Sequence, residues 1–159
     1  MGEAALQWTK AEFESDDEPG FGEIRRGYLK GELRRAILDV NMGDHYGVSI
    51  DVYADALRKP VFVLIRESSW SFVAPEKSED TVKERRLYFE NEKLTKVLEK
   101  TYSFQDEKQM VARRDAAVNK KVAIGPTMGG KWYGLSNALF YENSIEKLRQ
   151  HAEAFADFK

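Results

Sequence analysis

The sequence predicts an α+β domain, in which an antiparallel sheet of successive hairpins, at roughly 23–103, carries C-terminal helices packed on one face. Three observations predict this class. A hairpin-like phrase occurs three times, apolar and polar residues alternate in the β-rich stretches, and the pattern changes to helical spacing after Ser103. A length of 159 residues fits a single domain, 1–159, that buries a core without disulfides or metal.

The hairpin-like phrase is an aromatic or β-branched residue followed five positions later by Leu. Gly31, Asp55 and Asn91 stand between these positions, and each tolerates a turn backbone at little cost. Each copy is therefore typical of a strand, a tight turn and a returning strand. Unequal spacing of the copies indicates three hairpins of one irregular sheet and not a regular repeat array. The copies are Tyr28–Leu33, Val52–Leu57 and Phe89–Leu94.

The first strands follow from the N-terminus onward. Trp8 and Phe13, followed by acidic residues and a Pro-Gly pair, predict a strand that runs into a surface loop. A turn at Asn41–Asp44 then separates a strand at Leu33–Val40 from a strand at Tyr46–Val52. In the second of these, apolar and polar residues alternate as in a half-buried strand.

The later strands lie on either side of a polar connection. Val61–Ile65 is apolar on both faces, which predicts a central strand, and Pro60 is acceptable as its first residue. A polar connection at 74–80 follows. Val82–Phe89 and Leu94–Tyr102 then form the third hairpin.

Two helices are predicted after the sheet. The first, at about 104–118, is charged and poor in β-formers, and Ser103 with Asp106 resembles an N-terminal cap. Asn143 and Glu146 form a capping box for the second helix. Its apolar stripe needs cover, which one face of the sheet supplies. The stripe consists of Ile145, Leu148, Ala152 and Phe155.

The composition excludes several classes of protein. A net charge of -2 gives no general attraction to nucleic acid or to an anionic membrane. The absence of Cys excludes disulfides, thiolate catalysis and Cys-ligated zinc. The longest apolar run, Val61–Ile65, is too short to span a bilayer, so no transmembrane segment is predicted.

The glycine-rich stretch Gly125–Lys131 fits the first seven positions of a phosphate-binding P-loop. The eighth position is Trp132, however, which has no hydroxyl group to hold magnesium. A P-loop also opens a helix early in a parallel sheet, whereas this stretch lies near the end of the chain. We therefore interpret it as a connection between two helices and expect no nucleotide binding.

No other motif predicts a metal, a cofactor or a catalytic residue. His45 and His151 lack the spacing of a metal motif, and no Gly-x-Ser-x-Gly elbow is present. The acidic run Glu14–Glu18 lacks the Gly and the terminal Glu of an EF-hand loop. We interpret that run as a solvated loop.

Arginine pairs suggest an anion site. Three pairs lie in predicted strands, where neighbouring side chains point to opposite faces, so each pair places one guanidinium on each side of the sheet. If the outer face collects Arg26, Arg35 and Arg85, it forms a fork-shaped anion site. The alternative that we favour is pairing with nearby carboxylates. The pairs are Arg25–Arg26, Arg34–Arg35, Arg85–Arg86 and Arg113–Arg114, and the carboxylates are Glu23, Glu32 and Glu84.

Aromatic residues, which make up 12% of the chain, are the remaining candidates for ligand contacts. Trp70 and Phe72 share one face of their strand, whereas Trp132 and Tyr133 lie in the glycine-rich stretch. Exposed aromatic rings around a concavity anchor sugars, peptides or proteins, although such rings are more often part of a core. These four residues and the three arginines are the candidate ligand-binding residues.

The stretch Leu87–Leu94 resembles the hairpin units of uncharacterised exported bacterial proteins, in which an aromatic-x-Asn-Gly-Lys-Leu unit recurs before a C-terminal helix. Glu92 stands here where Gly is usual. The resemblance implies a periplasmic or lipoprotein-like domain and carries over no catalytic residues. Met1–Leu6 lacks the pattern of a signal peptide, which leaves a cytoplasmic protein or an exported one whose signal has been removed. On the strength of the resemblance we expect a periplasmic or secreted protein, with the cytoplasm as the alternative.

The leading functional hypothesis is a non-enzymatic binding or interaction domain of the bacterial envelope, which contacts a protein, peptide or glycan through a sheet face or aromatic loops. One alternative is a small α+β enzyme or ligand-binding cup whose pocket holds a carboxylate acid or base. Another is a structural subunit that pairs through its edge strands. A deep pocket with a perturbed acid favours the enzyme, and a shallow arginine and aromatic surface favours the binding domain.

Overall fold

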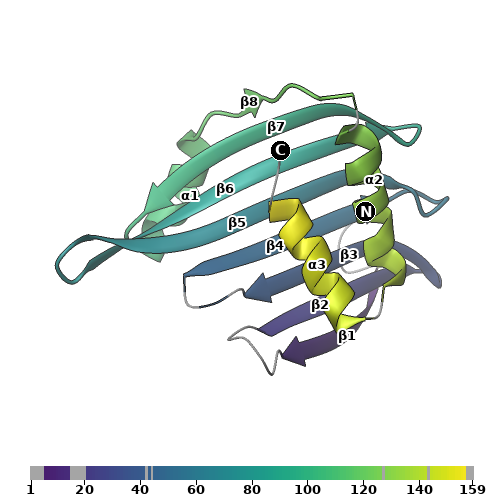
Figure 1. Ribbon diagram of the computed structural model, residues 1–159, viewed down its shortest axis with the longest axis horizontal. Coiled ribbons are helices and arrows are strands. Elements are labelled where there is room, and N and C mark those ends of the chain that lie inside the picture. Colours follow the sequence, from purple (N-terminus) through teal and green to yellow (C-terminus); the bar gives the residue numbers. More distant parts are fainter. Residues whose placement is uncertain are drawn as a thin grey trace.

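The computed structural model describes residues 6–14, 21–41, 43, 45–126, 128–142 and 144–156. Within these residues, strands follow one another across a single sheet, and each pairs antiparallel with its neighbours in sequence (Figure 1). The predicted α+β class with successive hairpins is confirmed. The elements are β1 (Gln7–Glu14), β2 (Phe21–Leu29), β3 (Glu32–Asn41), β4 (Tyr46–Ala54), β5 (Pro60–Ala74), β6 (Lys77–Glu90), β7 (Lys93–Phe104), α1 (Glu107–Ala116), β8 (Lys120–Lys121), α2 (Met128–Tyr141) and α3 (Ile145–Ala156).

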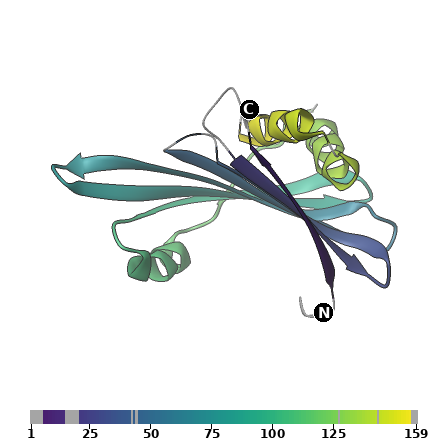
Figure 2. The same cartoon turned by 90° about the horizontal axis from the view of Figure 1, so that it is seen from below.

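The two faces of the sheet are covered differently. The helix-covered face lies under α2 and α3, whereas α1 packs against β7 on the opposite face, which we call the open face (Figure 2). Because side chains alternate along each strand, the register assigns residues to one face or the other. Ile24, Leu38, Ile50 and Ile65 form one cross-strand row of the helix-covered face, and Asp39, Ser49, Arg66, Glu84 and Lys100 form one row of the open face.

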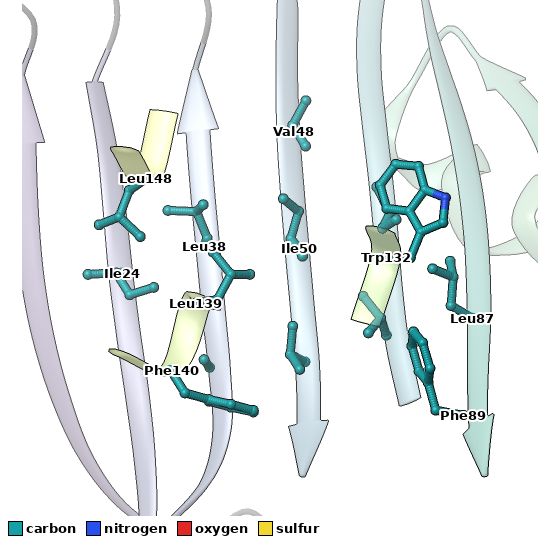
Figure 3. Packing of buried hydrophobic residues seen from close by; sticks show 14 of the residues in the cluster. Ile24, Leu38, Val48, Ile50, Leu87, Phe89, Trp132, Leu139, Phe140 and Leu148 are labelled. Carbon is teal, nitrogen blue, oxygen red and sulfur yellow. The ribbon is translucent and has the colours of Figure 1, made fainter. Parts of the chain in front are cut away.

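The main hydrophobic core lies between the helix-covered face and its two helices (Figure 3). Trp132 and Leu139 of α2 are fully buried, and Leu148 of α3 is buried beside them. Burial of each such side chain stabilises the fold by about 1.5–3 kcal/mol relative to exposure. This packing holds α2 and α3 on the sheet.

Helix α2 begins at Met128, inside the stretch that we interpreted as a connection, so that interpretation is wrong for 128–133. Glycine disfavours helices intrinsically, and this hides the start of α2 in the sequence. A Cβ atom at Gly129 would lie 3.4 Å from the Cβ of Leu94, an ordinary van der Waals contact, so α2 lies close against β7 at this point. Burial of Trp132 then outweighs the poor propensity.

Helix α1 packs on a smaller apolar cluster at one end of β6 and β7. The N-cap is Asp106, whose carboxylate accepts a hydrogen bond from the backbone N–H of Lys108 at 3.0 Å. Ser103, the other predicted member of the cap, belongs to β7 and its hydroxyl lies 3.0 Å from the Thr81 hydroxyl, so the predicted pairing of Ser103 with Asp106 is wrong. None of the α1 side chains is buried. The cluster under α1 contains Val82, Tyr102 and Phe104, with Met110 and Ala117 against them.

Two of the three predicted tight turns are confirmed. Lys30 and Gly31 join β2 to β3 with φ of 51° and 82°, and Asn91 and Glu92 join β6 to β7 with φ of 49° and 67°. Two successive positive φ values are what a two-residue type I′ turn requires. Glu92 thus occupies a position that favours glycine.

The second copy of the phrase differs from the prediction. Strand β4 ends at Ala54 and β5 begins at Pro60, with a loop between them. In this loop the Asp55 carboxylate accepts hydrogen bonds from the N–H groups of Leu57 and Lys59 at 2.9 and 3.0 Å. Leu57 is 74% exposed, so the prediction of a tight turn with a returning Leu is wrong here.

The β5–β6 hairpin is longer than predicted and extends beyond the rest of the sheet (Figure 1). Pro75 and Glu76 join the strands, and residues 77–80 belong to β6, so a polar connection at 74–80 is wrong for that part. Side chains 71–78 are exposed on both faces. Strands without cover need no apolar face, and their sequence therefore resembles a loop.

Other predictions concern the chain ends. Strand β1 confirms the predicted N-terminal strand, and α3 confirms the C-terminal helix. Leu148 is the member of the predicted stripe whose side chain the structure describes, and it is buried. The predicted loop at 15–20 and the capping residue Asn143 lie outside the described residues.

In the described segments, no helix is long and apolar enough to cross a membrane.

Candidate ligand-binding site

An open hollow of about 810 Å³ lies beside α1, mainly on the open face of the sheet. Strands β1 to β7 form its floor and wall, and α1 supplies Met110 and Arg114. A volume in this range suits a small molecule or a short segment of a larger one, because typical ligand pockets measure about 300–1,000 Å³. Residues that line it include Asp39, Ser49, Arg66, Trp70 and Tyr102.

A buried carboxylate, Glu84, organises the floor next to this hollow. Its side chain is 1% exposed, and its Oε1 accepts hydrogen bonds from Arg66 Nε and from the Tyr102 hydroxyl, both at 3.0 Å. Its Oε2 makes no hydrogen bond in the described structure, but Arg86 and Lys100 lie 3.8 and 3.9 Å away. Glu84 therefore acts as the counter-ion that holds Arg66 in place.

Lys100 connects this network to α1. Its Nζ donates a hydrogen bond to the backbone oxygen of Arg114 at 2.9 Å, and the Lys100 side chain is 8% exposed. A cation near the C-terminal end of a helix is favourable because the last carbonyl groups carry partial negative charge. The bond fixes the end of α1 over the open face.

Two tyrosines of the hollow stay protonated well above neutral pH. Burial raises the pKa of Tyr102 to about 12, with the nearby Glu84 carboxylate as the second cause. Burial also raises the pKa of Tyr46 to about 12, with Glu67 as the second cause. Both hydroxyl groups therefore stay protonated throughout the physiological range, and that of Tyr102 keeps its hydrogen bond to Glu84.

Aromatic rings form one rim of the hollow. The His45 ring stacks on Trp70 with centroids 3.8 Å apart, and His45 Nδ1 lies 3.1 Å from the Trp70 backbone oxygen. Phe72 contacts Trp70 edge to face at 5.4 Å and is itself 69% exposed. Trp70 thus joins the hollow to the exposed β5–β6 hairpin.

The side of the hollow formed by β1 to β3 carries carboxylates that already have cationic partners. Glu23 pairs with Arg25 at 2.9 Å and with Lys10 at 3.4 Å, and Lys10 also pairs with Glu12 at 2.8 Å. Asp39 lies 3.4 Å from Arg25. Charges on this side are therefore largely compensated within the sheet.

The structure separates the four predicted aromatic residues. Trp70 lies at the rim of the hollow, and Phe72 contacts it from outside the lining. Trp132 is fully buried in the core, and Tyr133 packs against Phe89 on the helix-covered face. The Tyr133 hydroxyl also donates a hydrogen bond to Glu92 at 3.3 Å. Trp132 and Tyr133 therefore lie away from the hollow.

The three predicted arginines do not meet on one face. Arg26 holds the end of α2 by donating to the Leu139 and Glu142 backbone oxygens. Arg35 forms a two-bond pair with Asp51 on the open face at 2.9 and 2.7 Å. Arg85 lies on the helix-covered side and pairs with Glu67 and Glu99.

Carboxylate pairing, which we favoured for the arginine pairs, is confirmed for the three predicted acids. Arg25 pairs with Glu23 at 2.9 Å, and Arg34 pairs with Glu32 at 3.0 Å. Arg86 lies 3.8 Å from Glu84. In two of the pairs the neighbouring guanidinium groups lie on opposite faces, as strand alternation predicts. Arg26 and Arg85 lie on the helix-covered face, and Arg25 and Arg86 lie on the open face.

Sequence reasoning missed Arg66 as a site residue and used Glu84 and Arg114 only as members of charge pairs. Arg66 stands alone in the sequence, and its neighbour Glu84 is on the next strand. A correct β5–β6 register would have placed these two residues opposite one another. Arg114 reaches the hollow only because α1 packs back on the open face, which local sequence does not encode.

A second, smaller hollow of about 440 Å³ lies along the other side of α1 and includes Arg113 and Phe104. Neighbouring arginines of α1 thus line different hollows. Among the described residues, no group of three or more His, Asp or Glu side chains is arranged to hold a metal ion.

Comparison with protein-family models, with curated proteins and with solved structures found no match for this chain. The functional argument therefore rests on the geometry of the site.

Proposed function

We propose that this protein is a non-enzymatic binding domain that holds its ligand in the hollow beside α1. The observation that carries the proposal is an open hollow of about 810 Å³ with Trp70 at its rim. Aromatic rings at the edge of a concavity provide rigid contact area at low entropic cost. A short segment of a peptide, a glycan or a partner protein fits such a surface.

The position of the carboxylates supports binding over acid/base catalysis. Glu84, the buried carboxylate of the floor, is 1% exposed and already accepts two hydrogen bonds. Glu23 and Asp39 are paired with cations. A catalytic acid or base needs to reach the proton that it transfers, and the partners of Glu84 close it off from the hollow, while cations already neutralise Glu23 and Asp39.

Ligand screening by NMR tests the proposal. The chain has three Trp residues, and their indole N–H signals report separate places. A ligand in the hollow is expected to shift the Trp70 signal, while Trp132, buried in the core, serves as the internal control. Peptide and glycan libraries that leave Trp70 unchanged would contradict the proposal.

A Trp70→Ala variant tests the role of the rim. We expect it to weaken binding about tenfold, because truncation of an aromatic anchor removes contact area and lets water enter the contact. Tyr141→Ala is the matched control, since Tyr141 is 56% exposed and belongs to α2 on the other side of the sheet. Equal loss in both variants would point to a general effect on folding.

Action in the bacterial envelope is part of the same proposal and rests on the resemblance of the Leu87–Leu94 hairpin. Fractionation of cells that express the native gene tests it. Recovery with the periplasmic or membrane fraction is expected, and recovery with the cytoplasmic fraction would contradict it.

A further inference from the structure

Arg66 and Arg114 approach the hollow from two sides, one from β5 and the other from α1. Both lie close enough to Tyr102 to affect its hydroxyl group, where they oppose the larger effect of burial on its pKa. The side chain of Arg66 is 42% exposed and that of Arg114 is 35% exposed. Their guanidinium groups are therefore accessible to a ligand.

Both arginines keep unused hydrogen-bond donors. Arg66 donates through Nε to Glu84, and its terminal NH₂ groups make no hydrogen bond to any described residue. Arg114 donates through Nε to the neighbouring Asp115 at 3.4 Å, and its terminal groups are likewise unbonded within the described structure. A guanidinium presents five donors in a planar fork, so most donors of this pair remain free.

The local balance of charge favours an anion beside them. Arg66, Arg86 and Lys100 surround one carboxylate on the floor, that of Glu84. Asp80 is the further carboxylate that lines the hairpin side of the hollow, and the acids of β1 to β3 have their own cationic partners. Asp115 pairs with Arg114 at 3.4 Å, and with this carboxylate counted the side near α1 still carries more positive than negative charge.

The two arginines are also held in position before a ligand arrives. Glu84 fixes the Arg66 guanidinium from beneath, and the Lys100 bond fixes the backbone at Arg114. Preorganised donors lose less entropy on binding than mobile ones. This distinguishes the pair from arginines that extend freely into solvent.

We infer that the hollow recognises an oxyanion, a carboxylate, sulfate or phosphate group of the ligand, held between Arg66 and Arg114. This inference rests on the proposed function, because it names the chemical group that the same hollow selects. The terminal NH₂ groups of the two arginines donate to the oxyanion, and the Trp70 rim contacts the remainder of the ligand.

Titration of isotope-labelled protein with sodium phosphate, followed by NMR, tests the inference. Sodium chloride at equal ionic strength is the reference, because screening alone also moves signals. We expect saturable shifts at Arg66 Nε–H and at the backbone of Tyr102 and Arg114. Shifts no larger than those in chloride would overturn the inference.

Matched variants separate a site from general charge. Arg114→Gln is expected to weaken phosphate binding about tenfold, and Arg66→Gln by a similar factor. Arg113→Gln is the control, because it removes the same charge from the same helix but faces the second hollow. If Arg113→Gln weakens binding equally, the effect is nonspecific and the inference fails. Arg114→Gln alone decides the matter if Arg66→Gln disturbs folding through Glu84.

Two further probes identify the carrier of the oxyanion. A sulfated oligosaccharide and a phosphopeptide are titrated into wild type and Arg114→Gln, and tighter binding of one of them that depends on Arg114 identifies that ligand class. If an uncharged ligand shifts the Trp70 indole signal while phosphate has no effect, the proposed function stands and the oxyanion inference fails. If neither acts on the hollow, both fail.

Discussion

The two faces of one sheet are stabilised in different ways. Ile50 and Ile65 of the helix-covered face are fully buried under α2 and α3. Glu84, on the open face of the same sheet, is as buried as they are, but its neighbours are cations and a hydroxyl group. Strand alternation alone assigns these residues to their faces.

The comparison shows that a buried side chain in a sheet can be stabilised either by apolar packing or by charged and polar partners. On the helix-covered face, stability grows with the apolar area removed from water. On the open face, stability depends on whether each charge keeps its partner, since a buried charge without one is strongly destabilising. Mutations on the two faces should therefore follow different rules.

The largest effect is expected for Trp132→Ala on the helix-covered side. Trp132 is fully buried, so its truncation leaves a cavity and lowers the free energy of unfolding by about 3–5 kcal/mol. Urea denaturation measures this loss. Tyr141→Ala on the same helix is the control, with a change within about 0.5 kcal/mol, because Tyr141 is 56% exposed. A loss below about 1 kcal/mol for Trp132→Ala would mean that α2 is not anchored there.

The next effect tests the rule for charges on the open face. Asp51→Ala leaves Arg35 without the partner that accepts two of its hydrogen bonds, and we expect a loss of about 3 kcal/mol. Arg35→Met combined with Asp51→Leu is expected to recover most of the stability, because apolar replacements of both partners remove the unpaired charge. Additive losses in the double variant, measured by urea denaturation, would contradict the rule.

A smaller effect is expected at alkaline pH. The pKa of Tyr102 is about 12 in the folded protein against an ordinary value of 10, so between these pH values the unfolded chain loses the proton first. The folded state then binds more protons, and stability falls as pH rises from about 10 to about 12. Below pH 10 the contribution is constant.

Tyr102→Phe isolates this contribution from that of the other titrating groups. Its urea midpoint should fall less steeply with pH than that of wild type, and phenolate absorbance should show one fewer late-titrating tyrosine. Tyr46→Phe provides the comparison, because burial raises the pKa of Tyr46 to about 12 as well, next to Glu67 instead of Glu84. Identical pH profiles for wild type and Tyr102→Phe would contradict the assignment.

The smallest effect is expected in the β5–β6 turn, which lies beyond the cover of the helices. Glu76 has φ of 62° and is exposed, so Glu76→Gly is expected to change stability favourably by up to about 1 kcal/mol. Glu92→Gly serves as the contrast, since Glu92 has φ of 67° but pairs with Lys59 at 3.0 Å. Thermal unfolding should show a larger gain for Glu76→Gly, and the reverse order would show that the Lys59 pair contributes nothing.

The sequence predicts the sheet better than the site. Alternation from Tyr46 to Val52 and the turn at Asn91 are local signals, and both correspond to structure. The start of α2 was missed because Gly129 is a poor helix former, although α2 packs against Leu94 at this point. Local preference and tertiary packing conflict at this position.

The candidate site depends almost entirely on contacts between distant segments. Trp70 was found from its residue type, but its place at the rim follows from its contact with His45. Arg66 and Arg114 come together only when β5 takes its register and α1 folds back over β7. No short pattern encodes that pairing, so the site could not be predicted from the sequence.

The order of the elements along the chain has a consequence for synthesis. Each strand from β2 to β7 bonds to the strand made immediately before it, so the sheet is able to grow from its N-terminal end while the ribosome is still at work. Helices α2 and α3, however, are made after the strands that they cover. At roughly 5–20 residues per second, the apolar face is left uncovered for several seconds. Chaperone contact during that interval would protect Ile50 and Ile65 until the helices arrive.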